Sequence, residues 1–347
     1  GKRRHLSSPL NLNGSVGRGS AGVDMNTIPP LAIDRIEVLR DGASSQYGSD
    51  AIAGVINIQL KKREGGRAQV SYGKYITTME DVAVVDTVSP TTAATGDPAI
   101  TFTGNDRKRR DGGTTTFATN IGLPFGDTGY LNLTAEYKDR SPTNRSGADL
   151  RRNYAGIGDP REVTIDRYWH RYGDGASKDL NFFFNGGMDV GSSFEIYSFG
   201  SYGVRDGNGA GFYRRALDVR NADFSNGGLP FYPDGFLPII TSEIRDIAIA
   251  GGIRGEAAGW NIDLSANYGS NRLNYGIENT FNTSLGGRDS PRKFNAGGLR
   301  SGQTSINFDA NRGIDFGLGD TTLALGGEWR NENYKIVPGE VASYVAG

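Results

Sequence analysis

Two short segments of this 347-residue sequence are dense in side chains that bind small molecules. One reads DRYWHRYGD, from position 166 to 174, and the other reads GFYRRALDVR, from 211 to 220. Aromatic rings stack on flat ligands, and arginines pair with anions. The residues that could contact a ligand are Tyr168, Trp169, His170, Arg171, Tyr213, Arg214 and Arg215. The same side chains could instead pack within folded loops, and both interpretations stay open.

The composition excludes several kinds of site chemistry. The sequence has no cysteine and 2 histidines, His5 and His170, so disulfides, cysteine-based metal sites and multi-histidine metal centres are excluded. Carboxylates flank His170, but no serine or cysteine nucleophile context accompanies it. We therefore predict no enzymatic activity, no cofactor and no protein-bound metal. A net charge of −1 gives no reason to expect a nucleic-acid partner.

The elements that position these segments are predicted to be β-strands. Glycine is abundant at 52 residues, with 16 tyrosines and 16 phenylalanines, as in a β protein with many turns. In YLNLTAEYKD, from 130 to 139, apolar and polar residues alternate, so each kind lies on its own face of a strand. Segments 260–271, 305–316 and 321–334 repeat the alternation, with Arg312 as an exception on the apolar face.

The connections between these strands favour a transmembrane barrel over a soluble sandwich. Short turns at 125–129, 189–193, 255–259 and 317–321 alternate with long polar stretches near 80–111, 141–177, 207–239 and 273–300. Membrane barrels have short periplasmic turns and long outer loops. A barrel strand needs only about 9–11 residues. The sequence contains no run of about 18 apolar residues, which a transmembrane helix would need. Aromatic residues near strand ends suit the interfacial girdles: Tyr130, Trp260, Trp329 and Tyr334.

The segment Ile33–Lys62 contains the most specific motif of the chain. It reads IDRIEVLRDGASSQYGSDAIAGVINIQLKK, two strand-like runs around a stretch of small residues. This segment resembles the end of the plug domain of TonB-dependent outer-membrane transporters. The motif positions are Gly42, Tyr47, Gly48, Gly54 and Asn57, and Val55, Ile56 and Ile58 are expected to form a buried strand. Small residues let the plug backbone approach the barrel wall closely.

The resemblance implies the fold and the domain boundary. We expect a mainly β protein, with the C-terminal part of a plug at residues 1–65 and the N-terminal part of a transmembrane antiparallel barrel at 66–347. The complete family barrel has about 22 strands and a plugged lumen. About ten strands can be placed after residue 65. The chain is therefore expected to be a fragment of a protein about twice as long, because half a barrel would leave open edges in lipid.

The resemblance also implies a latch between plug and barrel. Plug arginines of the family pair with acidic residues of the lumen, and Arg35 and Arg40 are the candidates here. Glu136 and Glu328 stand on polar strand faces and are their candidate partners. A desolvated latch of this kind would be costly to break one partner at a time. The alternative is that these charges are simply solvated.

The implied function is active import of a nutrient across the Gram-negative outer membrane. TonB, energised through ExbB and ExbD, would pull the plug to open a path. A ferric siderophore is the expected cargo, and oligosaccharide, cobalamin, haem or a plant-derived aromatic compound are alternatives. A secreted β-rich adhesin or carbohydrate-binding module is the alternative of another class. Outer-membrane lipid and lipopolysaccharide are further expected partners.

Two remaining motifs are assigned to loops. GRGSAG, from 17 to 22, matches a dinucleotide fingerprint, but the following VDMNTIPP cannot continue as a helix. We interpret it as a plug loop in which Arg18 could touch the ligand. NDRKRRD, from 105 to 111, is a basic run expected in a solvated loop that could meet anionic lipopolysaccharide.

Overall fold

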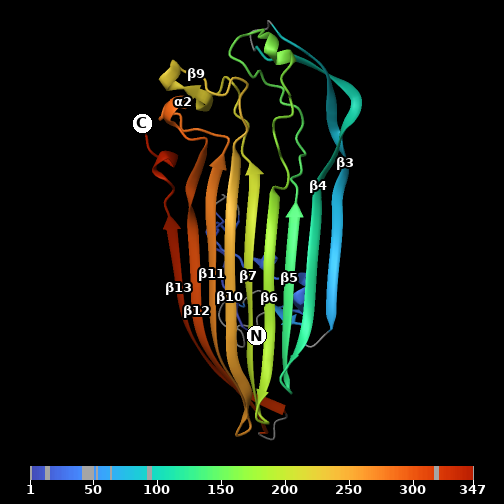
Figure 1. The fold of residues 1–347 in the computed structure, drawn as a ribbon, viewed down its shortest axis with the longest axis vertical. Helices are drawn as coiled ribbons and strands as arrows, with labels where there is room; N and C mark the ends of the chain where they lie inside the picture. The colour runs from blue at the N-terminus through green and yellow to red at the C-terminus, as the bar shows by residue number, and fades with distance from the viewer. Residues whose placement is uncertain are drawn as a thin grey trace.

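Nine long antiparallel strands form one curved sheet in the computed structural model (Figure 1). The structure describes residues 2–11, 16–40, 51, 54–62, 65–91, 96–315 and 320–346. The order across the sheet, β13-β12-β11-β10-β7-β6-β5-β4-β3, follows the chain without a crossover. The strands are β3 (Gly66–Ser89), β4 (Ala99–Phe125), β5 (Gly129–Arg140), β6 (Ala176–Val190), β7 (Phe194–Ala210), β10 (Ile239–Ala257), β11 (Trp260–Glu278), β12 (Lys293–Asp315) and β13 (Asp320–Val337).

Short and long connections alternate between the two ends of the sheet, as the sequence predicts. Residues 126–128, 191–193 and 258–259 form tight turns at the lower end in Figure 1. Residues 141–175, 211–238 and 279–292 form long loops at the upper end, with short elements inside them. In the described part of the chain, no helix has the length and apolar character needed to span a membrane.

The two faces of the sheet have an inverted polarity. On β6, Phe182 is 47% exposed on the outer face, whereas Asp179 and Asn181 on the inner face are 2% and 3% exposed. On β11, Leu264 is 49% exposed while Asn271 is fully buried. Apolar side chains on the outside and buried polar ones on the inside suit a sheet whose outer face meets lipid.

The hairpin β3–β4 differs from the sequence prediction. In the polar stretch near 80–111, residues 80–89 and 99–111 are strand and not loop, because β3 and β4 stay paired from Gly66–Ile121 up to Ser89–Ala99, with several register shifts. β5 pairs with β4 only between Thr114 and Phe125, so the rest of the hairpin rises above the neighbouring strands (Figure 1). Valines and threonines favour a strand here without an apolar stripe. The basic run 105–111 is therefore part of β4, not of a loop.

Two aromatic residues that were expected at the membrane interface point inward instead. Tyr130 is 9% exposed, and the ammonium group of Lys62 lies 5.3 Å from its ring centroid. Tyr334 donates a hydrogen bond to the carbonyl oxygen of Ser8 at 3.0 Å. Alternation places even-numbered residues of β5 on the polar face, and Tyr130 follows that rule.

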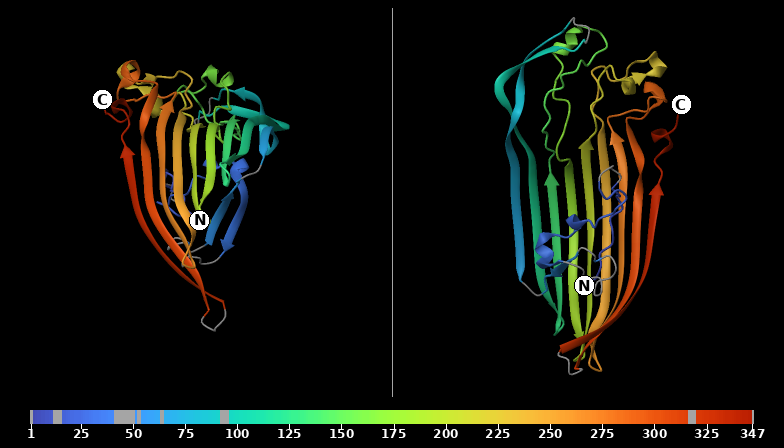
Figure 2. Two further views of the ribbon diagram at one scale, coloured as in Figure 1. Left: turned by 60° about the horizontal axis from the view of Figure 1, so that its bottom comes forward. Right: turned by 180° about the vertical axis from the view of Figure 1, so that it is seen from behind.

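The described residues before β3, which we call the plug segment, lie in the concavity of the sheet (Figure 2). They form the 3₁₀ turns η1 (Met25–Thr27) and η2 (Pro30–Ala32) and the antiparallel hairpin of β1 (Ile33–Arg40) with β2 (Gly54–Leu60). β3 begins at Gly66, and the division into domains at residue 65 stays a prediction.

The hairpin explains part of the plug motif. Gly54 has φ +140°, and a Cβ there would lie 2.4 Å from the carbonyl oxygen of Leu39, so only glycine fits. Asn57 donates to Glu37 at 2.9 Å. The expectation that Ile56 belongs to a buried strand is wrong, because its side chain is 64% exposed. The motif residues Gly42, Tyr47 and Gly48 lie outside the described residues.

We predict that a charge on the outer face destabilises the sheet in a bilayer. Phe182→Arg, at the middle of β6, should lower the free energy of folding into vesicles by about 2–4 kcal/mol. Heat-modifiable migration of the full-length receptor after folding into vesicles at graded urea concentrations measures this. Ser192→Arg, in a short exposed turn, is the control and should fold as the parent does; equal loss for both variants would contradict a lipid-facing role for Phe182.

Candidate functional site

The two aromatic and basic segments of the sequence meet at the long-loop end of the sheet. The rings of Trp169 and Tyr213 stack with centroids 5.6 Å apart and an interplanar angle of 8°. His170 meets the edge of Tyr213 at 5.8 Å and stacks on Tyr172 at 5.6 Å. Tyr213 is 5% exposed, and its hydroxyl donates to the carbonyl oxygen of Asp234. Loops 141–175 and 211–238 are thereby joined through their aromatic side chains.

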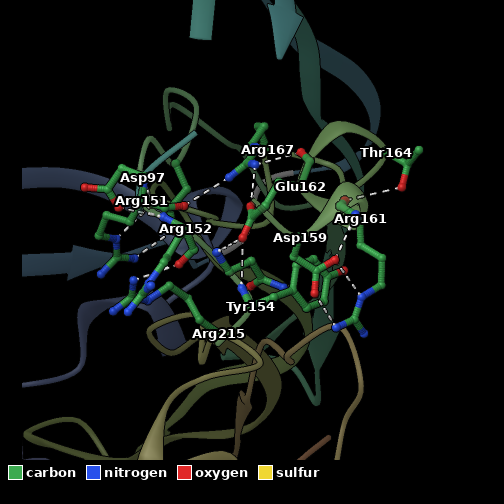
Figure 3. Close-up of polar contacts among 12 residues, drawn as sticks. Asp97, Arg151, Arg152, Tyr154, Asp159, Arg161, Glu162, Thr164, Arg167 and Arg215 are labelled. Carbon is green, nitrogen blue, oxygen red and sulfur yellow. Dashed lines mark hydrogen bonds and ion pairs between the residues drawn. The ribbon is translucent and has the colours of Figure 1, made fainter. Parts of the chain in front are cut away.

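A buried ion pair holds the first of these loops in shape (Figure 3). Glu162, in η3 (Pro160–Val163), is 2% exposed and accepts a 2.6 Å hydrogen bond from Arg167. Its other oxygen accepts the backbone N–H groups of Asn153 and Tyr154 at 2.7 and 2.9 Å. Arg167 also donates to the carbonyl oxygen of Arg151 at 3.0 Å. A buried carboxylate with this many donors fixes the backbone on both sides of it.

Next to the aromatic stack, the carboxylate of Asp149 pairs with Arg151 and His170. Arg151 donates two hydrogen bonds to its carboxylate at 2.8 and 2.7 Å, and Nε2 of His170 lies 3.1 Å from Oδ2. Burial raises the pKa of Asp149, but the hydrogen bonds from Arg151 and His170 outweigh burial and lower this pKa to about 2. Asp149 is therefore ionised at physiological pH and orients both partners.

An open cleft of about 680 Å³ lies beside this group. Aromatic rings and guanidinium groups line it together, and the acids Asp149 and Asp218 stand among them. The rings belong to His170, Tyr172, Phe212 and Tyr213, and the guanidinium groups to Arg151, Arg214 and Arg220.

Arg214 differs from the other two arginines of the cleft. Arg151 and Arg220 each lie 2.7 Å from a carboxylate, that of Asp149 and that of Asp218. Among the described residues, no carboxylate forms an ion pair with Arg214. Burial lowers the pKa of Arg214, and the neighbouring Arg220 lowers it further. A guanidinium stays protonated all the same, so this position favours an anionic ligand group.

The other predicted ligand residues of these segments form hydrogen bonds with neighbouring strands and loops. The hydroxyl of Tyr168 accepts the backbone N–H of Val85 at 3.0 Å, and the guanidinium of Arg107 lies 3.9 Å from its ring centroid. Arg171 donates to Asn208 at 3.3 Å and Arg215 to the carbonyl oxygen of Arg152 at 2.8 Å. Arg18 is exposed in the turn at 16–19, within the plug segment. A direct ligand contact for these residues stays a prediction.

The predicted latch is wrong in its partners. Arg35 is exposed and pairs within its own segment, 2.8 Å from Glu37 and 3.1 Å from Asp34. Arg40 is also exposed. The two predicted acids form no ion pair with them among the described residues: Glu136 stands on the inner face of β5, and Glu328 lies 3.9 Å from Arg330. The reason is local, since a β1 arginine reaches acids of the same hairpin first.

Another set of charges joins the plug segment to the sheet. Arg4 donates to Asp246 of β10 at 2.8 Å, and Nε2 of His5 lies 2.9 Å from the other carboxylate oxygen. Asp246 is 2% exposed and also accepts from Asn271 at 2.9 Å. Asn271 in turn accepts both the N–H and the hydroxyl of Ser8. We call these five residues the Asp246 network.

Gly269 makes room for the network. A Cβ on this β11 residue would lie 2.2 Å from Nδ1 of His5, so any side chain there would displace the imidazole. Glycine is required by close approach and not by its backbone angle.

Amides of the wall hold the rest of the plug segment. Asn132 donates to the carbonyl oxygen of Lys62 at 3.1 Å, and Asn185 to that of Lys61 at 2.8 Å. Asn181 donates to the carbonyl oxygen of Asn26 at 3.1 Å. At the short-turn end, Lys2 lies 3.0 Å from Asp263. The inner face of the sheet is thus matched in hydrogen bonds by the segment that it surrounds.

Sequence reasoning missed Asp149, Arg151 and the Asp246 network. The run KRRH at 2–5 offered a weak signal, because four basic residues beside a polar-lined wall need acids somewhere on it. Asp246 itself looks like any polar residue of an alternating strand.

A plug segment hydrogen-bonded inside a curved sheet with an apolar outer face is the arrangement of a plugged outer-membrane barrel. Residues 8–55 match the family model described as TonB-dependent Receptor Plug Domain. The iron-regulated outer membrane virulence protein of Vibrio cholerae serotype O1 is 50% identical over 54 residues, 14% of this chain and 8% of that protein. The ferrienterobactin receptor of Escherichia coli strain K12 is 42% identical over 62 residues, 16% of this chain and 8% of that protein.

Solved structures show the same fold over most of the chain. A mutant of the ferric enterobactin receptor from Pseudomonas aeruginosa in complex with enterobactin aligns with a TM-score of 0.52 and 14% identity, over 94% of this chain and 39% of that one. The siderophore receptor PirA from Acinetobacter baumannii aligns with a TM-score of 0.50 and 17% identity, over 91% and 38%. The chain thus spans less than two fifths of these receptors. Residues 8–55 are thus similar to the plug domain of TonB-dependent receptors, and the described chain has the fold of part of such a receptor.

We predict that the Asp246 network determines how firmly the plug is held. Asp246→Asn leaves Arg4 buried without its carboxylate and should weaken plug attachment in the full-length receptor by about 3–5 kcal/mol. Protease accessibility of residues 2–11 at graded urea concentrations measures this. Asp309→Asn is the matched control, because that carboxylate is 60% exposed and its 3.4 Å pair with Lys2 should contribute about 0–1 kcal/mol. Equal effects of the two substitutions would rule out the network as the main attachment.

We also predict that the loop cluster loosens in acid. The folded-state pKa of Asp149, about 2, lies below its unfolded value of about 3.9. The stabilisation is therefore complete above about pH 4 and is lost as the pH falls toward 2. It should amount to about 2 kcal/mol. Fluorescence of Trp169, with Trp260 and Trp329 replaced by phenylalanine, reports the change.

Asp149→Asn separates this titration from general acid unfolding. The variant should show a loosened Trp169 environment already at pH 7 and little further change between pH 4 and pH 2. Asp159→Asn, in the exposed Asp159–Arg161 pair, should leave the transition where it is. A transition unchanged in Asp149→Asn would contradict the assignment.

Proposed function

We propose that the protein imports a ferric siderophore across the Gram-negative outer membrane in a TonB-dependent step. Similarity to two proteins supports this proposal: the ferrienterobactin receptor of Escherichia coli strain K12 and an iron-regulated outer membrane virulence protein of Vibrio cholerae. The family consists of receptors and transporters, so we propose no chemical step on the cargo.

The observation that carries the cargo proposal is the cleft between the loops. It combines flat aromatic rings with Arg214, a guanidinium that the described carboxylates leave unpaired. Ferric chelates with aromatic, anionic donor groups offer both a stacking surface and negative charge. Asp149 and Glu162 preorganise the loops, so the ordering cost on binding is low.

In the proposed mechanism, the plug segment, which lies inside the curve of the sheet (Figure 2), closes the path between the cleft and the short-turn end. TonB, acting with ExbB and ExbD, is the proposed partner that moves the plug. The Asp246 network is then the set of contacts that the pulling force must break or carry with it. Outer-membrane lipid and lipopolysaccharide are the proposed surroundings of the apolar outer face.

Oligosaccharide, cobalamin, haem and other aromatic compounds remain alternative cargoes of the same mechanism. The vitamin B12 transporter BtuB of Vibrio cholerae is 56% identical over 41 residues, 12% of this chain and 7% of that protein. The plug segment is therefore similar in proteins named for different cargoes and does not select among them. The cleft is the feature that favours an anionic aromatic chelate.

Uptake of iron-55 siderophore complexes by cells that carry the full-length gene tests the proposal. We expect uptake that requires functional TonB. Uptake that persists without TonB would refute active transport. No uptake of any siderophore, with the protein correctly placed in the outer membrane, would refute the iron assignment and favour a glycan, cobalamin, haem or another aromatic cargo.

Arg214→Gln connects uptake to the cleft. A lost charge-assisted hydrogen bond should weaken the apparent affinity for an anionic siderophore about 10- to 100-fold. Arg161→Gln is the matched control, because this guanidinium is 54% exposed and already paired with Asp159 at 2.7 Å. Unchanged affinity in Arg214→Gln would exclude this cleft as the binding site.

A further inference from the structure

The basic run of β4 is divided between the two faces of its strand. Arg107 is 8% exposed, faces inward beside Met79 and donates to the carbonyl oxygen of Ser146. Arg109 lies 3.7 Å from Asp111. Lys108 and Arg110 alternate with them and are exposed on the outer face. Arg107 therefore anchors loop 141–175, whereas Lys108 and Arg110 face away from that loop.

The two outward cations lie at the upper rim of the apolar outer face. Arg110 pairs in register with Ile76, which is 72% exposed. Lower on the same hairpin, Tyr72, Val70 and Phe117 are 68%, 69% and 50% exposed. Lys108 pairs with Thr78, two residues further up the hairpin than Ile76. The sequence of surfaces is thus apolar, then cationic, as at the boundary between acyl chains and head groups.

Neither cation is neutralised by the protein. Over the described ranges, Lys108 and Arg110 have no carboxylate at ion-pairing distance. Because side chains two apart on a strand are about 7 Å from each other, the two like charges also repel. The acids Asp106 and Glu80 stand further up the hairpin and are exposed. An anion between or beside the two cations would relieve this repulsion.

We propose that Lys108 and Arg110 bind a phosphate group of lipopolysaccharide in the outer leaflet, with the acyl chains against Ile76, Tyr72 and Phe117. The proposal rests on the outer-membrane location in the proposed function and adds to it a defined lipid site. A guanidinium and an ammonium group are the two side chains that bind phosphate best. The hairpin presents both on its outer face, about 7 Å apart along β4.

Binding of purified lipopolysaccharide to the full-length, delipidated receptor in detergent tests the site. Lys108→Gln/Arg110→Gln should bind about 30-fold more weakly than the parent protein, the equivalent of about 1 kcal/mol for each cation near an anionic membrane surface. Dephosphorylated lipid A should bind the parent and the double variant equally. Inorganic phosphate at millimolar concentration should not compete, since it lacks the acyl chains.

Arg312→Gln is the matched control for charge alone. Arg312 is an exposed arginine on the same outer face, near the short-turn end of β12. It should leave lipopolysaccharide binding unchanged. Equal losses in the control, or no loss in the double variant that migrates as a folded barrel, would overturn the proposal. So would equal affinity of the parent protein for phosphorylated and dephosphorylated lipid A.

Iron-55 uptake distinguishes this proposal from the proposed function. A receptor that imports siderophore normally but binds lipopolysaccharide independently of Lys108 and Arg110 refutes the lipid site alone. A receptor that never reaches the outer membrane refutes both.

Discussion

The buried carboxylate of Asp246 needs hydrogen-bond donors, and the fit between the plug segment and the sheet depends on that requirement. A sheet whose outer face is apolar turns its polar side chains inward, and there they lie out of reach of bulk water. Asp246 is 2% exposed and Asn271 is fully buried. Arg4 and His5 supply donors to Asp246, and Ser8 supplies donors to Asn271. The wall and the plug segment therefore satisfy each other, and neither surface is suited to stand alone.

The long loops solve a similar problem by a different route. Loops 211–238 and 279–292 share a cluster of aromatic rings around the buried Phe236 and Phe281. In loop 141–175, Glu162 and Arg167 add hydrogen bonds to the backbone. Asp149 does the same for Arg151 and His170. Among the described residues of the cleft, Arg151 and Arg220 are paired with carboxylates, whereas Arg214 forms no ion pair.

The architecture could be predicted from the sequence because it depends on repeated, short-range patterns. Alternating polarity gave the strands and their inner face, and the alternation of turn lengths gave the two ends. The pattern failed at 80–111, where the described strand residues stand above the apolar belt and lack an alternating apolar face. It also failed for Tyr130 and Tyr334, because a strand-end aromatic residue can face either way.

The site could be predicted only in part. Composition indicated the two aromatic and basic segments, and the structure brings Trp169, His170 and Tyr213 together. The latch could not be assigned, because the partner of a plug cation depends on where the chain enters the sheet. Arg35 found acids on its own hairpin, whereas Arg4 reached an aspartate 242 positions away. A pairing between residues so far apart in the sequence leaves no periodic pattern from which it could be predicted.

Gly269 has a consequence for how plug and barrel vary between related receptors. Its missing side chain is the recess into which His5 fits. A barrel with alanine at this position would accept only a plug with a smaller residue in place of His5, and a histidine-bearing plug would need a glycine opposite. Positions 5 and 269 should therefore covary across homologues, and chimeras that exchange plugs between receptors should assemble only when this pair is exchanged together.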